Sequence, residues 1–215
     1  MSWTEVLLKL ISAYLLGSLS GSLILGRLRG VDVRQLGSGN AGGTNAFRAQ
    51  GWRFALAVVL VDVGKGLLAV WLAQGGVAEP ALALRIGLAA SAAVVLGHVW
   101  PVFFGFKGGK GAATLIGALG MLWPLVLLPL LVVWLLTMML TGFVGLSTML
   151  GAIALIPLVW WIAPDADRML WLGTAVSIAL FLVFTHRSNI QRMRNGSENR
   201  FERIRVIGRW LERGR

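Results

Sequence analysis

Six stretches of almost uninterrupted apolar residues limit this chain to one class of fold. Five of them have a length that suits one membrane crossing: Val6–Leu25, Phe54–Ala73, Ala81–Val99, Thr148–Ala163 and Met169–Thr185. A helix needs about 20 apolar residues to cross a hydrocarbon core of about 30 Å, and shorter helices cross where the bilayer thins. Hydrophobic residues make up 57% of the 215 positions and charged residues only 13%, unlike an ordinary soluble domain. We therefore expect an all-α, polytopic integral membrane protein.

The sixth stretch, Ala112–Thr141, does not fit one upright helix. At about 1.5 Å per residue it is too long for a single crossing and short for two. Trp123 and Pro124 lie near its middle, and proline interrupts a helix because it lacks a backbone N–H. The stretch is either one crossing or two short ones that meet at Trp123-Pro124.

The distribution of basic residues decides between one and two crossings, because cytoplasmic loops are rich in Lys and Arg. Arginines gather between 27 and 53, lysines lie at 107 and 110, and nine arginines follow Thr185. The only basic residue in the loops at 74–80 and 164–168 is Arg168. A single crossing would leave the arginine-rich tail outside, whereas two crossings return it to the cytoplasm. We predict seven transmembrane helices, with the N-terminus outside and the C-terminus cytoplasmic.

Composition also excludes several classes of function. The chain has no cysteine, which removes disulfides, thiolate catalysis and cysteine metal sites, and two histidines are too few for a histidine-rich metal site. The net charge is +11, and the arginines cluster beside apolar segments. In that position, lipid headgroups and phosphate substrates are better partners than nucleic acid. We expect a single domain over residues 1–215 in the lipid bilayer, with no cofactor, no metal, no nucleic acid and no obligate protein partner.

The first of three polar segments is rich in glycine and in hydrogen-bond donors. It contains Gly37, Ser38, Gly39, Asn40, Gly42, Gly43, Thr44, Asn45 and Arg48. If a helix begins near Gly43, Thr44 and Arg48 lie at its N-terminus, where backbone N–H groups bind anions. A flexible connector is the alternative interpretation, but a connector does not need so many donors.

The second polar segment places two lysines before another helix. The sequence Lys107-Gly108-Gly109-Lys110-Gly111 runs into the helix-favouring Ala112–Leu115. A glycine loop that leads into a helix N-terminus, with a lysine at its mouth, is typical of a phosphate site. A lysine pair that only fixes the topology is the alternative, and it would not require three glycines.

The third polar segment, residues 186–192, follows the last apolar stretch. His186 and Asn189 are three positions apart and would share a helix face beside Arg192, which favours binding of a charged substrate. His98, at the end of an apolar stretch, is instead expected to have a structural role.

Charged side chains also occur within the apolar stretches. Asp62 and Lys65 are either functional, because ions are costly in a membrane, or simply neutralise each other. Lys9 is expected to tolerate alanine. Beyond the last span, residues 194–215 form a basic segment that we predict to be an amphipathic surface helix, with Phe201, Ile204, Ile207 and Leu211 on one face.

These motifs together resemble one enzyme family. The order Gly-Ser-Gly-Asn-x-Gly-x-Thr-Asn-x-x-Arg, then Gly-His-x-x-Pro-Val-Phe-x-Gly-Phe-Lys-Gly-Gly-Lys-Gly-x-Ala-Thr, then His-Arg-x-Asn-Ile-x-Arg is similar to that of the bacterial acyl-phosphate-dependent glycerol-3-phosphate acyltransferases, the PlsY family. Asp62-x-x-Lys65-Gly66 and residues 196–200 also match. The resemblance implies a seven-helix protein of the bacterial cytoplasmic (inner) membrane with its site on the cytoplasmic face.

The resemblance also implies a reaction and a set of residues. Acyl phosphate and sn-glycerol 3-phosphate would give lysophosphatidate and phosphate, without acyl-CoA or metal, and a substrate phosphate would take the proton. The implied catalytic residues are Ser38, Arg48, Lys110, His186 and Asn189. The implied phosphate-binding residues are Gly37, Asn40, Thr44, Asn45, Lys107, Gly108, Gly109, Gly111 and Thr148. One departure is that Gly142 and Gly145 stand where the family often has Arg and Ser.

Two other classes remain open at this point. A transporter or scramblase would need charged or broken helices at the bilayer centre and an internal repeat, and the chain shows no repeat. A lipid phosphatase or a CDP-alcohol phosphotransferase is the second alternative, but the latter needs an aspartate-rich metal motif. This chain has no Asp between Asp62 and Asp165.

Overall fold

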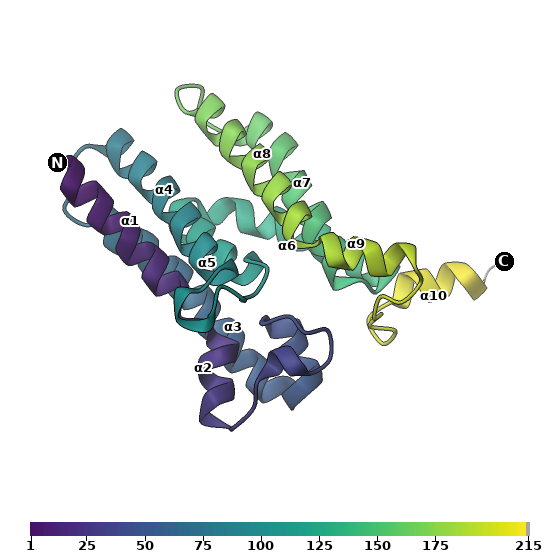
Figure 1. Cartoon of the computed structure of the whole chain (residues 1–215). Coiled ribbons are helices and arrows are strands. Elements are labelled where there is room, and N and C mark those ends of the chain that lie inside the picture. Colours follow the sequence, from purple (N-terminus) through teal and green to yellow (C-terminus); the bar gives the residue numbers. More distant parts are fainter. Residues whose placement is uncertain (214–215) are drawn as a thin grey trace. The chain divides into compact units, whose positions relative to one another are not determined.

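All regular structure in the computed structural model is helical, and the structure describes residues 1–213 (Figure 1). The chain forms two compact units, one from Met1 to Pro124 and the other from Leu125 onward. The last two residues of the predicted basic surface segment lie outside the described residues.

The first unit holds the first two polar segments. Its helices are α1 (Trp3–Gly17), α2 (Gly21–Leu28), η1 (Val33–Gln35), α3 (Gly43–Gln74), α4 (Pro80–Val99), η2 (Val102–Phe104) and α5 (Ala112–Leu122). Helix α1 packs along α4, and α3 packs against both α4 and α5 (Figure 1). The first polar segment is supported by an apolar cluster of buried residues, which includes Leu23, Val33, Ala46, Phe54 and Val58.

Side chains cap the starts of α1 and α4. The Ser2 hydroxyl accepts the Glu5 N–H at 3.2 Å, and the Glu5 carboxylate accepts the Ser2 N–H at 2.6 Å. Glu79 accepts the N–H groups of Ala81 and Leu82 at 2.8 and 2.6 Å and so begins α4. Such caps satisfy donors that have no partner within the helix.

Lys9 has a role that the sequence did not suggest. Its ammonium group donates to the carbonyl oxygens of Ala73 at 2.8 Å and Gly75 at 2.7 Å. These two carbonyls lie at the C-terminus of α3, where a cation is favoured by the helix dipole. Replacement of Lys9 by alanine therefore removes a cap.

The first predicted span is not one continuous helix. Where we expected an unbroken crossing over Val6–Leu25, α1 ends at Gly17, α2 begins at Gly21, and their axes differ by 47°. Backbone groups released at such a break need other partners in a membrane. Lys65 donates to the Leu19 carbonyl at 3.1 Å and Asp62 accepts the Gly21 N–H at 3.1 Å, so charged residues of α3 stabilise the break.

Helix α3 is also interrupted. Gly51 has φ +81° and ψ −178°, which separates a short segment that begins at Gly43 from the longer apolar part. A side chain at this position would be strained, because only glycine adopts this backbone conformation freely. The expected helix start near Gly43 is present, and the predicted span Phe54–Ala73 lies within the second part of α3.

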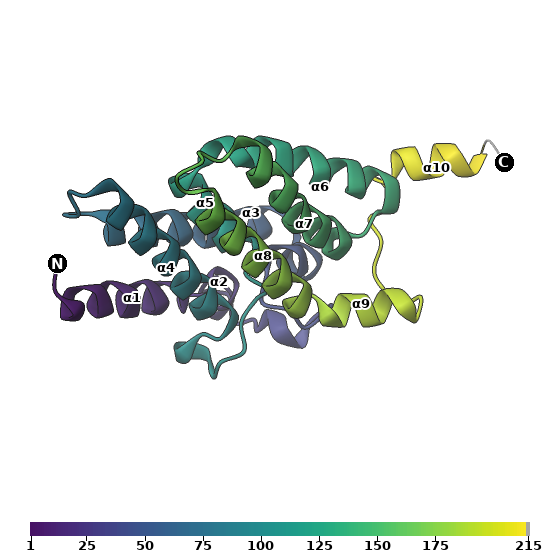
Figure 2. The ribbon, with the colours of Figure 1, turned by 90° about the horizontal axis from the view of Figure 1, so that it is seen from above.

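The second unit holds the third polar segment. After η3 (Pro124–Val126) it contains α6 (Leu127–Thr141), α7 (Val144–Ile162), α8 (Arg168–Thr185), α9 (Arg187–Arg194) and α10 (Val206–Arg213). Helices α6, α7 and α8 lie side by side (Figure 2). The predicted interruption at Trp123-Pro124 is present, because α5 ends at Leu122 and α6 begins at Leu127.

The predicted C-terminal helix is shorter than expected. Within residues 195–213 the α-helix is limited to Val206–Arg213, and Gly196, with φ +69°, follows the end of α9. The Phe201 N–H donates to the Gly142 carbonyl at 2.9 Å, so Phe201 lies at the end of α6 and not on the face of α10. Helix α10 itself packs on α6, where a Cβ at Gly208 would lie 2.2 Å from the Leu140 carbonyl oxygen.

Within residues 1–213, five helices are long and apolar enough to cross a membrane, or six when the bent pair α1–α2 counts as one crossing. Helix α5 is apolar but has only 11 residues. At about 1.5 Å per residue it is shorter than a hydrocarbon core of about 30 Å.

Candidate active site

The first polar segment is held in place from within α3. The Asn45 side chain is 1% exposed, and its oxygen accepts the Ser38 N–H at 2.7 Å. Its amide nitrogen donates to the carbonyls of Val33 and Leu36 at 2.8 and 2.9 Å. Asn45 was expected to bind phosphate, but here its polar atoms organise the loop. Ser38, Asn40, Thr44 and Arg48 lie around the N-terminus of α3 and are partly exposed.

Arg34 joins the first polar segment to the second. Its guanidinium donates to the carbonyls of Phe104 at 3.0 Å and Lys107 at 3.3 Å. Asp32 orients it through a contact of 2.8 Å between Nη2 and Oδ2. The hydrogen bond from Arg34 keeps the pKa of the Asp32 carboxyl below its usual value. An open pocket of about 660 Å³ lies here, lined by Arg34, Gly39, Phe104, Gly105, Lys107 and Gly108.

The second polar segment forms a loop against the end of α4. The N–H groups of Gly108 and Gly109 donate to the carbonyls of Val99 and His98, both at 3.1 Å. We expected the backbone of residues 108–111 to receive phosphate, but two of those donors are engaged here. Lys110 follows at once and is partly exposed, Gly111 caps α5, and Lys107 is exposed. Further backbone N–H groups that can face a phosphate lie in the first turn of α5, because the first N–H groups of a helix have no partner within it.

Three ionisable side chains are buried behind this loop. Lys65 Nζ lies 2.8 Å from Asp62 Oδ1 and 2.9 Å from His98 Nδ1. All three side chains are nearly inaccessible to solvent. The neutralising pair that the spacing of Asp62 and Lys65 allowed is present, and it also contacts His98.

In the second unit, His186 and Asn189 lie at the junction of α8 and α9, and both are buried. His186 Nδ1 is 2.8 Å from the Leu182 carbonyl oxygen. That distance requires Nδ1 to carry the proton, so in a neutral ring Nε2 holds the lone pair. The Asn189 amide donates to the Glu198 carboxylate at 2.8 Å.

Glu198 is a functional candidate that sequence reasoning did not select. Its side chain is only 4% exposed and accepts from Arg192 Nε at 2.6 Å as well as from Asn189. It thereby fixes the orientation of the Asn189 amide. The sequence indicates Glu198 only through its place in Gly196-Ser197-Glu198-Asn199-Arg200, a stretch that matches the family pattern but does not by itself suggest a role. Arg34 was likewise counted only as a positive charge.

One departure from the family pattern, Gly145, lies beside Asn189. A Cβ at Gly145 would be 2.8 Å from Asn189 Cγ, so the missing side chain makes room for the amide. The Thr148 hydroxyl, expected to bind phosphate, donates to the Val144 carbonyl at 2.9 Å and accepts from Trp134 Nε1 at 3.3 Å. Thr148 therefore joins α7 to α6.

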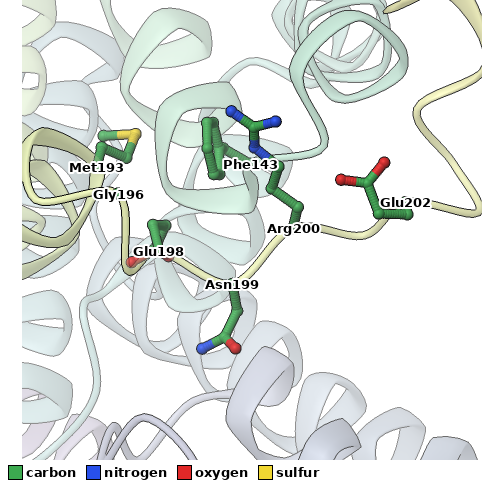
Figure 3. Close-up of a pocket in the computed structure, with 7 residues that line it drawn as sticks. All are labelled: Phe143, Met193, Gly196, Glu198, Asn199, Arg200 and Glu202. Atoms are coloured by element: carbon green, nitrogen blue, oxygen red, sulfur yellow. The ribbon is translucent and has the colours of Figure 1, made fainter. Parts of the chain in front are cut away.

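Figure 3 shows the residues that line an open pocket in the second unit. The volume of this pocket is about 620 Å³. It is lined by Phe143, Met193, Gly196, Glu198, Asn199, Arg200 and Glu202. The Arg200 guanidinium lies 4.6 Å from the Phe143 ring centre, a cation–π distance, and Glu198 borders the pocket. The polar tail after α9 thus forms a concave surface beside Asn189. Among the described residues, no group of three or more His, Asp or Glu side chains is arranged to hold a metal ion.

A family model described as glycerol-3-phosphate acyltransferase matches residues 7–196, almost the whole of the chain that carries these loops. The chain belongs to the glycerol-3-phosphate acyltransferase family. Relatives with that name include one from Chlorobaculum tepidum, 37% identical over 89% of this chain and 94% of the relative. Another, from Geobacter sulfurreducens, is 41% identical over 88% of this chain and 94% of the relative.

Two crystal structures of the acyltransferase PlsY (YgiH), an integral membrane protein, have the same fold. The glycerol 3-phosphate form matches with a TM-score of 0.80 and 35% identity over 91% of this chain and 95% of that chain. The lysophosphatidic acid form matches with a TM-score of 0.80 and 34% identity over 94% and 98%. The resemblance to glycerol-3-phosphate acyltransferases inferred from the three polar segments is confirmed, as is the integral membrane class.

Proposed function

We propose that this protein transfers an acyl group from acyl phosphate to the 1-position of sn-glycerol 3-phosphate, the first acylation step of phospholipid synthesis. The products are lysophosphatidate and inorganic phosphate. The observation that carries the proposal is the pair of glycine-rich loops that lead into α3 and α5. Each provides a helix N-terminus and a cation, which is the chemistry that binds a phosphate group. The solved relatives with glycerol 3-phosphate and lysophosphatidic acid support the choice of substrate.

In the first unit, we assign Ser38, Arg48 and Lys110 to the substrate phosphates. Asn45 and Arg34 hold the two loops in shape, since their polar groups bind the loop backbone. Four further residues complete the anion-binding surface beside the N-terminus of α3 or in the second loop: Gly37, Asn40, Thr44 and Lys107. Gly108 and Gly109 act through close packing, because their N–H groups are engaged by α4. Gly111 leads into the N-terminus of α5.

In the second unit, we assign His186 and Asn189 to the substrates. His186 donates through Nδ1 to the Leu182 carbonyl, which fixes the orientation of the ring, and we assign Nε2 to the substrate. Glu198 and Arg192 keep Asn189 in one orientation. Gly145 of α7 leaves room for the Asn189 amide, and Thr148 joins α7 to α6.

The proposed chemistry relies on orientation and charge neutralisation. An acyl phosphate is a mixed anhydride and is already activated for attack. The 1-hydroxyl oxygen of glycerol 3-phosphate bonds to the acyl carbon, the bond between that carbon and the phosphate oxygen breaks, and phosphate leaves. A substrate phosphate accepts the hydroxyl proton. The protein contributes the placement of two anions and the stabilisation of developing charge.

We further propose seven crossings, with the N-terminus outside, the C-terminus cytoplasmic and the site on the cytoplasmic face of a bacterial inner membrane. The positive charges near the polar segments support this topology. Helix α5 would be the short seventh crossing, with flanking residues completing its path. A reporter fused after Arg215 should be active only if it functions in the cytoplasm. Periplasmic activity would contradict the seven-helix count.

The reaction is tested by supplying purified protein in lipid with labelled glycerol 3-phosphate and EDTA. Palmitoyl phosphate should give labelled lysophosphatidate and phosphate in equal amounts, and palmitoyl-CoA should give much less product. A lipid phosphatase would release phosphate without glycerol 3-phosphate, and a transporter would form no lysophosphatidate. Equal rates from the two acyl donors would contradict the proposed donor.

A further inference from the structure

The buried group Asp62, Lys65 and His98 has no place in the binding chemistry described so far. The three residues are 1%, 5% and 2% exposed, within helices of a membrane protein. Charged groups in this setting are costly, and a buried ion pair is often no more stable than apolar residues of similar size. Mutual neutralisation explains why the pair is tolerated but not what it contributes.

His98 contacts the ion pair with one side of its ring and the glycine loop with the other. Its Nδ1 lies 2.9 Å from Lys65 Nζ and 3.4 Å from Asp62 Oδ1. A Cβ at Gly109 would lie only 2.1 Å from His98 Nε2 and 2.9 Å from the Ala41 carbonyl oxygen. The backbone of Gly109 therefore passes directly against the edge of the imidazole, and no other residue fits there.

The same ion pair also contacts the α1–α2 break. Lys65 donates to the Leu19 carbonyl and Asp62 accepts the Gly21 N–H, each at 3.1 Å. The His98 ring is thus held in place by Asp62 and Lys65 of α3, and the same two residues hydrogen-bond to the backbone at the α1–α2 break. The Gly109 N–H donates to the His98 carbonyl at 3.1 Å, so both the ring and the backbone of His98 define where Gly109 lies.

We propose that Asp62, Lys65 and His98 are positioning residues, which fix the Gly108–Gly109 backbone and through it the placement of Lys110 and the start of α5. This role rests on the proposed function, because Lys110 is taken to hold a substrate phosphate. Its importance follows from geometry: a misplacement of about 1 Å at a reacting site can reduce the rate by roughly a hundredfold.

The test separates positioning from neutralisation. The double variant Asp62→Asn/Lys65→Met leaves no unpaired charge, keeps an oxygen for the Gly21 N–H, and removes the contact between Lys65 and His98. It loses the hydrogen bond to the Leu19 carbonyl and should melt somewhat below wild type, but above Lys65→Met alone, which leaves Asp62 without its cation. We expect kcat/KM for glycerol 3-phosphate to fall about tenfold or more in the double variant, which equals about 1.4 kcal/mol or more of transition-state binding. Amide hydrogen exchange of Gly108 and Gly109 should be faster.

Two further variants keep the test decisive. His98→Phe preserves a ring beside Gly109 but loses the contact with Lys65, and it should show the same faster exchange even if the double variant does not fold. Lys9→Met removes the cap at the far end of α3 and should lower the melting temperature without changing loop exchange or kcat/KM. Wild-type exchange and kinetics in both the double variant and His98→Phe would overturn the positioning role. If wild type forms no lysophosphatidate, the proposed reaction fails, and amide exchange still decides the role of the network.

Discussion

The side-chain oxygen of Asn45 accepts the backbone N–H of Ser38 at 2.7 Å, so a residue inside α3 holds the loop that precedes that helix. Its amide nitrogen is used by two further backbone carbonyls of the same loop. The first polar segment is therefore preorganised around one buried side chain, and Ser38 is carried on a backbone with a fixed position.

Asn45→Ala should destabilise the protein as well as reduce activity. The substitution leaves the buried Val33 carbonyl, the partly buried Leu36 carbonyl and the partly buried Ser38 N–H without their partner. A buried group that loses its partner costs about 1–3 kcal/mol. Ser38→Ala removes only the hydroxyl and should reduce activity at an almost unchanged melting temperature. Thermal unfolding in detergent and acyl-transfer rates, measured on both variants, check this. A wild-type melting temperature for Asn45→Ala would show that the loop does not depend on this side chain.

Gly145→Ala should reduce activity although alanine favours a helix. The new methyl group would lie 2.8 Å from Asn189 Cγ and displace the amide that Glu198 orients. Gly173→Ala is the matched control, because it lies in α8 and a Cβ there meets nothing within 4 Å. Replacing an exposed helical glycine by alanine stabilises by up to about 1 kcal/mol. The control should keep wild-type kinetics, and equal kinetics in both variants would argue against a role for Asn189.

The ion pair of Asp32 and Arg34 should give stability that depends on pH. The pKa of Asp32 is lowered in the folded protein, mainly by its hydrogen bond with Arg34. Its contribution is therefore complete above the unfolded pKa of about 3.9 and is lost as the pH falls through the lower folded value. Wild type should be more stable than Asp32→Asn at pH 7, with a difference that shrinks below about pH 4.

The size of this difference should be modest, because the Asp32 side chain is 32% exposed and salt screens such pairs. Melting temperatures from pH 7 down to pH 3, compared with those of Arg34→Gln, provide the measurement. A gap between wild type and Asp32→Asn that grows on acidification would have the wrong sign for a carboxyl whose pKa is lowered.

Sequence alone located most helix boundaries around the site. Glycines before Gly43 and Ala112 predict two helix starts, and Pro124 predicts the break before α6, because glycine and proline act locally on the backbone. The α1–α2 break was missed because apolar residues continue through it. What stabilises the break are Asp62 and Lys65, which are distant in sequence, and hydropathy carries no record of such contacts.

The roles of individual polar residues were harder to predict than their presence. Asn45 and Thr148 have the right chemistry for phosphate, yet their hydrogen bonds go to neighbouring protein groups. Glu198 became important only because the tail after Gly196 turns back toward Asn189. The length of the last helix was overestimated for the same reason, since the tail at Phe201 bonds to Gly142.

The assignment of the two glycine-rich loops to substrate phosphate is tested most directly by steady-state kinetics of Arg48→Ala and Lys110→Ala. Loss of a charge-assisted hydrogen bond costs about 1.5–3 kcal/mol, so kcat/KM for glycerol 3-phosphate should fall roughly tenfold to a hundredfold in each variant. Both variants should remain folded in detergent, which a cooperative thermal transition would show. Arg53→Ala, an exposed arginine of the same helix, should have wild-type kinetics. If Arg48→Ala and Lys110→Ala match Arg53→Ala, the loops do not bind the substrate.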